Sequence, residues 1–153
     1  YLFLLVETPL ALHRGVSSCR MASMTNQTLA ELVVLAGETN EKNGYNGYAQ
    51  ARADGYGLQY LALKDLLEVG ENTEALEEIR MGHEPDEIYL SDNGKLEGYL
   101  IEKFDAIIRS FGTIYEVIRE HGLDPEETLA NLVGKIEYNA RRADTKVSGV
   151  KKF

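Results

Sequence analysis

Two acidic pairs within two long helical segments constrain the fold of this chain most. Glu68 and Glu71 lie in one segment with helical periodicity, and Glu102 and Asp105 lie in another. Residues three apart on a helix are neighbours, so each pair can present two carboxylates to one point in space. Two such helices packed together would form an oxygen-only site, which suits Mg²⁺ or Mn²⁺ better than zinc.

A cation would be needed wherever the four carboxylates converge. Two unit charges about 4 Å apart interact by about 4 kcal/mol at an effective dielectric constant near 20. The total stability of a domain is only about 5–15 kcal/mol, so unscreened convergence would be costly. The alternative is that both acidic pairs lie on solvated helix faces, in which case no metal site forms.

Length and charge limit the class of protein. The 153 residues suit one domain, and an apolar content of 44% is enough for a hydrophobic core. A formal net charge of −9, from 25 acidic and 16 basic residues, disfavours nucleic-acid and anionic-membrane partners. Cys19 is the only cysteine, which excludes an intrachain disulfide and favours a reducing, cytoplasmic location.

The first two dozen residues differ from the rest. Residues 2–6 form an apolar run that is too short to span a membrane, and Glu7 interrupts it where a signal peptide would stay apolar. We therefore expect residues 1–23 to be a leader, either disordered or foreign to the natural protein. Residues 24–153 are expected to form the folded domain.

Helical periodicity predicts four helices, and no segment has a convincing strand pattern. The predicted fold class is therefore all-α, an antiparallel four-helix bundle. Thr25 and Asn26 are possible caps of the first helix, and Asp124-Pro125 begins the last one. The predicted helices cover about residues 25–43, 58–81, 96–121 and 124–142, and the segments 43–57 and 82–95 are predicted loops.

Apolar positions predict which face of each long helix is buried. On the second helix, Glu68 lies within about 20° of Leu61 and Ala75 at about 100° per residue, inside the apolar arc. On the third helix, Glu102 lies off the apolar stripe and Asp105 lies at its border, so solvation is the more natural expectation there. The predicted arc contains Leu61, Val69, Ala75, Leu76 and Ile79, and the predicted stripe contains Leu100, Phe104, Ile107, Ile108, Phe111, Ile114, Tyr115 and Ile118.

One face of the fourth helix suits a polyphosphate. Lys135, Tyr138, Asn139 and Arg142 recur at positions i, i+3, i+4 and i+7, so they share this face. An ammonium, an amide and a guanidinium group are typical phosphate ligands. Basic residues in a last helical turn also complement the helix dipole, and this alternative stays open for a single arginine.

The order of these motifs resembles that of a known family. The segments 66–76, 102–109 and 135–142, with the ending at 149–153, are similar to the motifs of the MazG-like all-α nucleoside triphosphate pyrophosphohydrolases. The resemblance covers about residues 28–153. It implies a bundle completed by dimerisation, as a homodimer or a homotetramer.

The resemblance also implies an activity and a set of site residues. The implied reaction hydrolyses a nucleoside or deoxynucleoside triphosphate between its α and β phosphates, in house-cleaning of the nucleotide pool. The implied cofactor is Mg²⁺, and Mn²⁺ is possible. The implied metal ligands are Glu68, Glu71, Glu102 and Asp105, the proton acceptor is Glu71 or Glu74, and the substrate-binding residues are Lys135, Tyr138, Asn139, Arg142 and Arg109.

Several alternatives stay open at this point. Leu67 stands where the fullest form of the first motif has a further Glu, so the number of metal ions is open. The chain could be a non-catalytic nucleotide-binding module, a helical interaction module or a phosphoribosyl-ATP pyrophosphohydrolase. Base stacking and local packing are alternative roles for the aromatic rings of Tyr45, Tyr48, Tyr56 and Tyr60.

Overall fold

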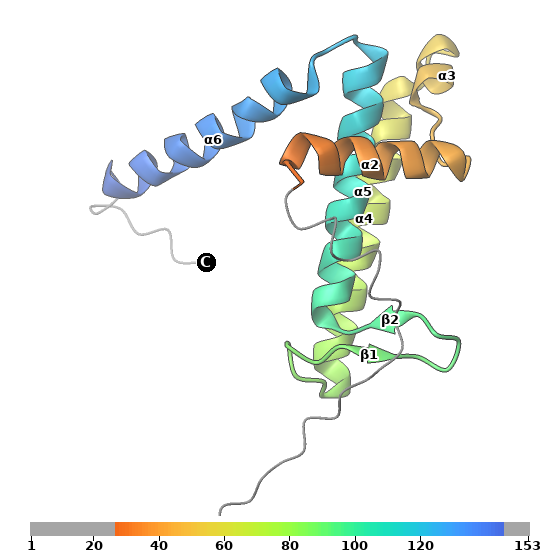
Figure 1. The fold of residues 1–153 in the computed structure, drawn as a ribbon, viewed down its shortest axis with the longest axis vertical. Coiled ribbons are helices and arrows are strands. Elements are labelled where there is room, and N and C mark those ends of the chain that lie inside the picture. Colours follow the sequence, from red (N-terminus) through yellow and green to blue (C-terminus); the bar gives the residue numbers. More distant parts are fainter. Residues whose placement is uncertain (1–26, 146–153) are drawn as a thin grey trace, which may run out of the picture.

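Two long antiparallel helices form the axis of the molecule (Figure 1). A computed structural model describes residues 27–145, and the side chains of residues 27–141. The prediction of an all-α chain is confirmed, apart from one short hairpin. The elements are α2 (Leu29–Lys42), α3 (Tyr48–Ala53), α4 (Gly57–Met81), β1 (Tyr89–Leu90), β2 (Leu96–Glu97), α5 (Tyr99–Glu120) and α6 (Pro125–Thr145).

Side-chain caps begin two of the helices. The Thr28 hydroxyl accepts a hydrogen bond from the backbone N–H of Glu31, and the Glu31 carboxylate accepts one from the backbone N–H of Thr28, which forms a capping box. The predicted leader and the possible caps at Thr25 and Asn26 lie outside the described residues. At α6, Asp124 Oδ1 accepts a hydrogen bond of 2.8 Å from the N–H of Glu127, as the sequence predicts.

Both connections predicted as loops contain regular structure, so that prediction is wrong in part. The six-residue α3 lies within 43–57, and β1 pairs with β2 in an antiparallel hairpin. These elements are too short to show a helical or alternating period, which is why the sequence pattern misses them. The hairpin ends at Gly98, whose φ of +125° and closeness to the Glu87 carbonyl leave no room for a Cβ atom.

The face of α4 that meets α5 is polar, which corrects the predicted apolar arc. Val69 and Leu76 of that arc are 59% and 55% exposed, whereas Glu71 and Glu78 are buried. Charged groups can occupy this seam because α5 and the hairpin supply partners for them. The buried and half-buried residues along the seam include Tyr60, Lys64, Glu68, Glu71, Ala75 and Glu78 at spacings of three and four.

The predicted stripe of α5 is correct only near its C-terminal end. Ile118 is buried, and Tyr115 packs so closely on Gly37 of α2 that a side chain there would overlap its ring. Near the start of α5, Phe104 is 50% exposed while Glu102 is only 2% exposed. The expectation that Glu102 is solvated is therefore wrong, because the α4 seam covers this face of α5.

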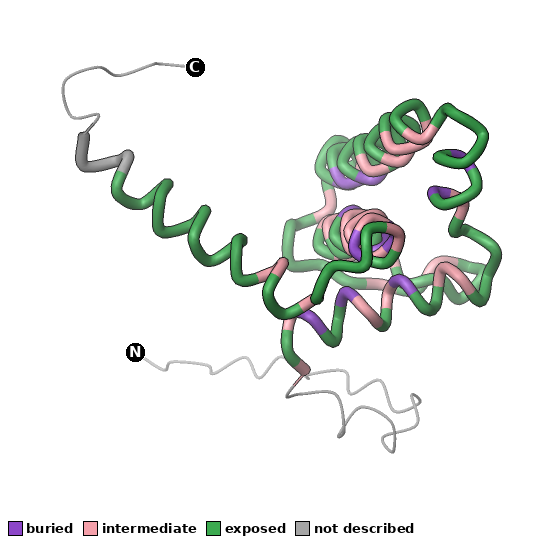
Figure 2. Tube along the Cα trace, turned by 90° about the horizontal axis from the view of Figure 1, so that it is seen from above, coloured by how far each residue is buried: buried purple, intermediate pink, exposed green. Residues whose placement is uncertain are grey.

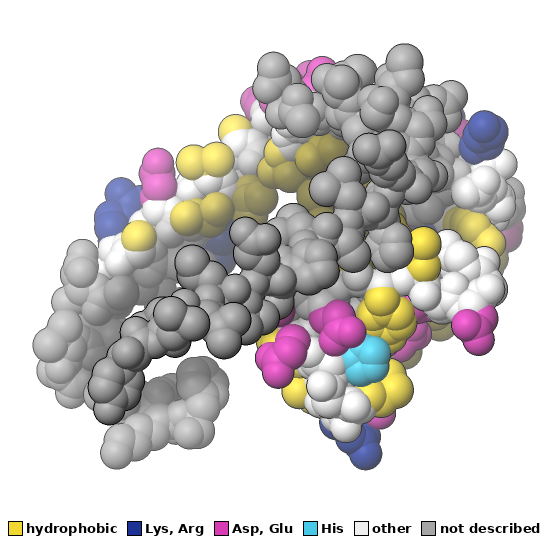
Figure 3. Space-filling model, turned by 60° about the horizontal axis from the view of Figure 1, so that its bottom comes forward, with side chains coloured by type: hydrophobic (Ala, Val, Ile, Leu, Met, Phe, Trp, Pro, Cys, Tyr) yellow, Lys and Arg dark blue, Asp and Glu magenta, His cyan; other side chains and the backbone are white. Residues whose placement is uncertain are grey.

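Helix α6 leaves the other helices after its first turns (Figures 1 and 2). Among the described elements it contacts α2 and α5, and every residue from 130 to 141 is exposed. Hydrophobic side chains are exposed along it (Figure 3). No helix within residues 27–145 is long and apolar enough to cross a bilayer.

Candidate functional site

Three carboxylates from two helices meet in the half of the α4–α5 seam that is nearer the hairpin. Glu71 and Glu74 lie one turn apart on α4, and Glu102 lies in the first turn of α5. One oxygen of each lies within 4.8 Å of the others. We call Glu71, Glu74 and Glu102 the carboxylate triad. Such an all-oxygen donor set suits a hard divalent cation such as Mg²⁺ or Mn²⁺.

Glu102 is the member of the triad that most needs a further partner. Its side chain is 2% exposed, and its Oε2 atom is buried without a hydrogen-bond partner among the described residues. Lys95 Nζ lies 3.5 Å from the other oxygen. Burial, and next the neighbouring Glu97 carboxyl, raises the pKa of Glu102 to about 7. A buried carboxylate with one unpartnered oxygen, grouped with two further carboxylates, fits a cation.

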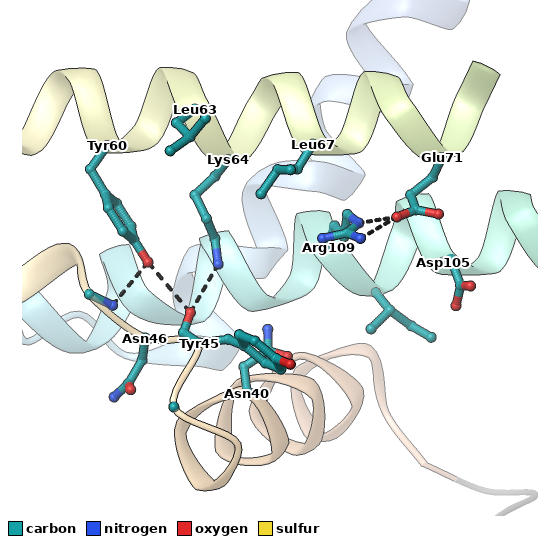
Figure 4. A pocket seen from close by; sticks show the side chains of 13 residues that line it. Asn40, Tyr45, Asn46, Tyr60, Leu63, Lys64, Leu67, Glu71, Asp105 and Arg109 are labelled. Carbon is teal, nitrogen blue, oxygen red and sulfur yellow. Dashed lines mark hydrogen bonds and ion pairs between the residues drawn. The ribbon is translucent and has the colours of Figure 1, made fainter. Parts of the chain in front are cut away.

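Two further residues of α5 lie beside the triad. The pKa of Asp105 is raised, first by burial and next by the negative charge of Glu71. Arg109, one turn further along, contacts Oε1 of Glu71 through both Nε and Nη2 (Figure 4). The guanidinium therefore neutralises one triad carboxylate.

The structure groups the predicted ligands differently from the sequence. Glu71 and Glu102, predicted as ligands, lie in the triad together with Glu74, which was predicted as a proton acceptor. Glu68 lies outside the triad, and its Oε2 accepts a hydrogen bond of 2.5 Å from the Ser110 hydroxyl. Asp105 also lies outside the triad but lines the adjoining cavity.

A cavity of about 650 Å³ extends from Glu71, the member of the triad that lines it, toward the loop before α3 (Figure 4). Glu71, Asp105 and Arg109 line one end, and residues from α2, the loop, the first half of α4 and one position of α5 line the rest. These remaining lining residues are Asn40, Gly44, Tyr45, Asn46, Gly47, Tyr60, Leu63, Lys64, Leu67 and Ile108. The cavity therefore has an anionic end and an end rich in amide and phenol groups.

Glu116 holds the loop end of this cavity together, and sequence reasoning missed it. Its buried carboxylate accepts hydrogen bonds from the backbone N–H groups of Gly47 at 2.9 Å and Tyr48 at 2.8 Å. It also accepts one from the Tyr60 hydroxyl at 3.1 Å and lies 3.1 Å from Lys64 Nζ. Burial, and next the charge of Glu116, raises the pKa of Tyr60 to about 12.

Two of the four candidate stacking tyrosines lie at the cavity. Tyr45, which is 67% exposed, and Tyr60 line it. Tyr48 is buried, and its ring centroid lies 6.3 Å from that of Tyr60 in a stacked arrangement. Tyr56 is not a lining residue of the described cavity. The local-packing alternative therefore describes Tyr48, and the stacking role stays a prediction for Tyr45 and Tyr60.

The predicted phosphate-binding face of α6 lies away from the triad in its own chain. Lys135 Nζ lies 5.3 Å from the ring centroid of Tyr138, and both residues, like Asn139, are exposed. The described residues that line the cavity include none from α6. The side chain of Arg142 lies outside the described part of the chain.

The site therefore combines a carboxylate triad, a neighbouring guanidinium and a cavity large enough for an organic ligand. Cavities of several hundred Å³ with a few convergent polar groups are typical of small-molecule sites. The triad would attract a divalent cation, and the cation would in turn attract an anionic ligand into the cavity. No family model, curated protein or solved structure matches this chain.

Proposed function

We propose that this protein hydrolyses nucleoside or deoxynucleoside triphosphates between the α and β phosphates in a Mg²⁺-dependent reaction. The observation that carries the proposal is the carboxylate triad, in which the buried Glu102 has one oxygen without a hydrogen-bond partner among the described residues and Glu71 lines an open cavity. The order of the sequence motifs supports the same reaction. The chain has a net charge of −9, so a triphosphate needs a cation to approach this site.

The triad and Asp105 are the groups that would hold the cation. When bound, Mg²⁺ supplies positive charge that neutralises the phosphate oxygens. Glu74 is the proposed proton acceptor, because it is exposed and makes no ion pair with any described residue, whereas Glu71 is paired with Arg109. Glu74 takes a proton from water as the water oxygen bonds to phosphorus. The bridging P–O bond between the α and β phosphates then breaks, and the nucleoside monophosphate and pyrophosphate separate.

We also propose that a second copy of the chain covers α6 and completes an antiparallel bundle. Leu132, Val133 and Ile136 on α6 are 45%, 57% and 59% exposed, and Leu66 on α4 is 66% exposed. Exposed apolar side chains that gather on one helix, as on α6, are typical of an interaction site. Pairing of identical chains in a closed dimer would bury these residues on both copies.

The proposed pairing bears on the predicted role of α6. Lys135 and Asn139 do not line the cavity of their own chain. Their predicted contact with phosphates therefore requires that α6 reach the cavity of another copy. If so, one variant with a substitution in the triad and another with a substitution on the α6 face would each be inactive alone. Mixing the two variants would restore activity through heterodimers. The substitutions Glu102→Gln and Lys135→Gln provide this complementation test.

A pyrophosphate assay tests the proposed reaction. Each common ribo- and deoxyribonucleoside triphosphate is incubated with the protein, with and without Mg²⁺, and pyrophosphate release is measured. We expect Mg²⁺-dependent release that is lost in Glu102→Gln and retained in Glu120→Gln, whose surface carboxylate lies on the same helix. Release of orthophosphate alone would contradict cleavage between the α and β phosphates. Binding without turnover would favour a nucleotide-binding module.

A further inference from the structure

Arg109 occupies the Glu71 carboxylate, which a bound cation would also need. Both Nε and Nη2 of Arg109 contact a single oxygen, Oε1 of Glu71 (Figure 4). The Glu71 side chain is 8% exposed, whereas that of Arg109 is 44% exposed. The carboxylate is therefore fixed in the seam, and the guanidinium has room to move into the cavity that it lines.

Arg109 and a divalent cation compete for Glu71. A cation bound by the triad needs an oxygen of Glu71, and Oε1 already accepts two N–H groups. A guanidinium left in this position would also repel the cation, because like charges a few ångströms apart interact by several kcal/mol at the effective dielectric constant of a protein. Cation binding thus favours a position of Arg109 away from Glu71.

Phosphate oxygens would give the displaced guanidinium a new partner. Arg109 lies at the anionic end of the cavity, between the triad and the loop end. A planar guanidinium binds phosphate through two parallel N–H···O hydrogen bonds. This step rests on the proposed function, since it assigns the phosphates to the end of the cavity next to the triad.

We propose that Arg109 is a positioning residue that holds Glu71 in the metal-free protein and transfers to the ligand phosphates when the cation binds. The consequence is a coupling between two binding events. Arg109 opposes the cation when no phosphate is present, and it favours phosphate once the cation is bound. Because such coupling is reciprocal, bound phosphate also strengthens cation binding by removing the competitor from Glu71.

Titration calorimetry with Mg²⁺ alone tests the competition. Arg109→Gln removes the guanidinium, and we expect it to bind Mg²⁺ at least about tenfold more tightly than the unsubstituted protein, the equivalent of one charge-assisted hydrogen bond. Arg119→Gln is the matched control, because Arg119 lies on the same helix and pairs with Glu41, outside the triad. Its Mg²⁺ affinity should not change. Equal or weaker Mg²⁺ binding by Arg109→Gln would overturn the competition.

Imidodiphosphate, a non-hydrolysable analogue of pyrophosphate, tests the transfer. At saturating Mg²⁺ we expect Arg109→Gln to bind it at least about tenfold more weakly than the unsubstituted protein does. Arg109→Lys keeps the charge without the planar fork, so its affinity should be intermediate. Equal affinities in all three proteins would overturn the transfer to phosphate.

The Mg²⁺ and imidodiphosphate titrations distinguish a failure of this inference from a failure of the proposed function. If neither the unsubstituted protein nor any variant binds Mg²⁺, the metal site fails and the inference fails with it. If every protein binds Mg²⁺ with the same affinity, the metal site stands and only the role of Arg109 is refuted. Circular dichroism and thermal melting of each variant show whether the fold is intact before affinities are compared.

Discussion

Removal of the Glu116 carboxylate should loosen the loop end of the cavity. Glu116 is 7% exposed, and its hydrogen bonds with Gly47, Tyr48 and Tyr60 and its ion pair with Lys64 join α5 to α4 and to the start of α3. Glu116→Ala would leave the Tyr48 N–H without its acceptor and the Gly47 N–H with the Tyr60 hydroxyl oxygen alone. The Lys64 side chain, which is 14% exposed, would keep the Tyr45 carbonyl as an acceptor but lose the carboxylate that compensates its charge. Solvent would reach these donors only after the loop moved.

The expected loss of stability in Glu116→Ala follows from the burial of these donors. Removal of one partner of a buried ion pair costs about 3–5 kcal/mol, because the other charge stays uncompensated. We therefore expect Glu116→Ala to lower the free energy of unfolding by about 4 kcal/mol, or the melting temperature by about 8–16 °C for a chain of this size. Glu116→Gln keeps the side-chain volume and one acceptor oxygen, so about half of this loss is expected.

Urea unfolding at a fixed protein concentration measures this loss. The matched control is Glu120→Ala, one turn further along α5, where the carboxylate pairs with Arg52 at 2.8 Å on the surface. Exposed pairs contribute about 0–1 kcal/mol, so the control should lose no more than that. Equal losses in Glu116→Ala and Glu120→Ala would refute the reasoning. A normal Mg²⁺-induced rise in melting temperature in Glu116→Gln would show that the triad is intact.

Three other predictions concern the metal, the pH and the assembly. Glu102→Gln should abolish the rise in melting temperature caused by Mg²⁺, because a neutral amide is a poor ligand for a hard cation; an unchanged rise in scanning fluorimetry would contradict the metal site. The pKa of Glu102 is about 7, above its ordinary value of 4.5, so the folded metal-free protein binds more protons than the unfolded chain between these values. The stability that Glu102 contributes should therefore fall as the pH rises from 4.5 to 7, so the unsubstituted protein should lose more stability over this range than Glu102→Gln does. The Mg²⁺-induced shift in melting temperature should be larger at pH 8 than at pH 6, which the same assay measures at both values. Ile136→Asp, on the exposed face of α6, should shift the mass found by sedimentation equilibrium toward that of one chain, whereas a mass identical to that of the unsubstituted protein would argue against the proposed interface.

The sequence predicts the helices better than it predicts their buried faces. The bounds of α4 and α5 follow from glycine and proline positions and from periodicity, because these signals act locally. The inward face of α4 could not be found in this way, because apolar residues occur all round that helix and charged residues occupy the seam. Val69 and Leu76 are exposed although they fit an apolar arc, since the partner helix approaches the other side.

The candidate site is only partly predictable, because local patterns place residues on one helix but do not show which helices pack together. Spacing of three on α4 identifies Glu71 and Glu74 as neighbours, and Glu102 joins them through tertiary packing that no local pattern contains. The role of Glu116 could have been suspected, because it follows Glu102 by two heptads and so lies near the same face of α5. The hydrogen-bond partners of Glu116 could not be predicted, because only the folded chain brings the loop that contains Gly47 next to α5.

The tip and the base of the hairpin between α4 and α5 differ in how much sequence change they tolerate. At its tip, residues 92–94 form an exposed turn, and the added length of an insertion there would extend into solvent. At its base, the Gly98 carbonyl accepts a hydrogen bond of 3.1 Å from the N–H of Glu102, and the Gly98 backbone leaves no space for a side chain. A change of length or residue at this base would shift the first turn of α5 and move Glu102 out of reach of Glu71. Changes at residues 92–94 should therefore leave the triad in place, whereas Lys95, which pairs with Glu102, and Gly98 tie this connection to the geometry of the triad.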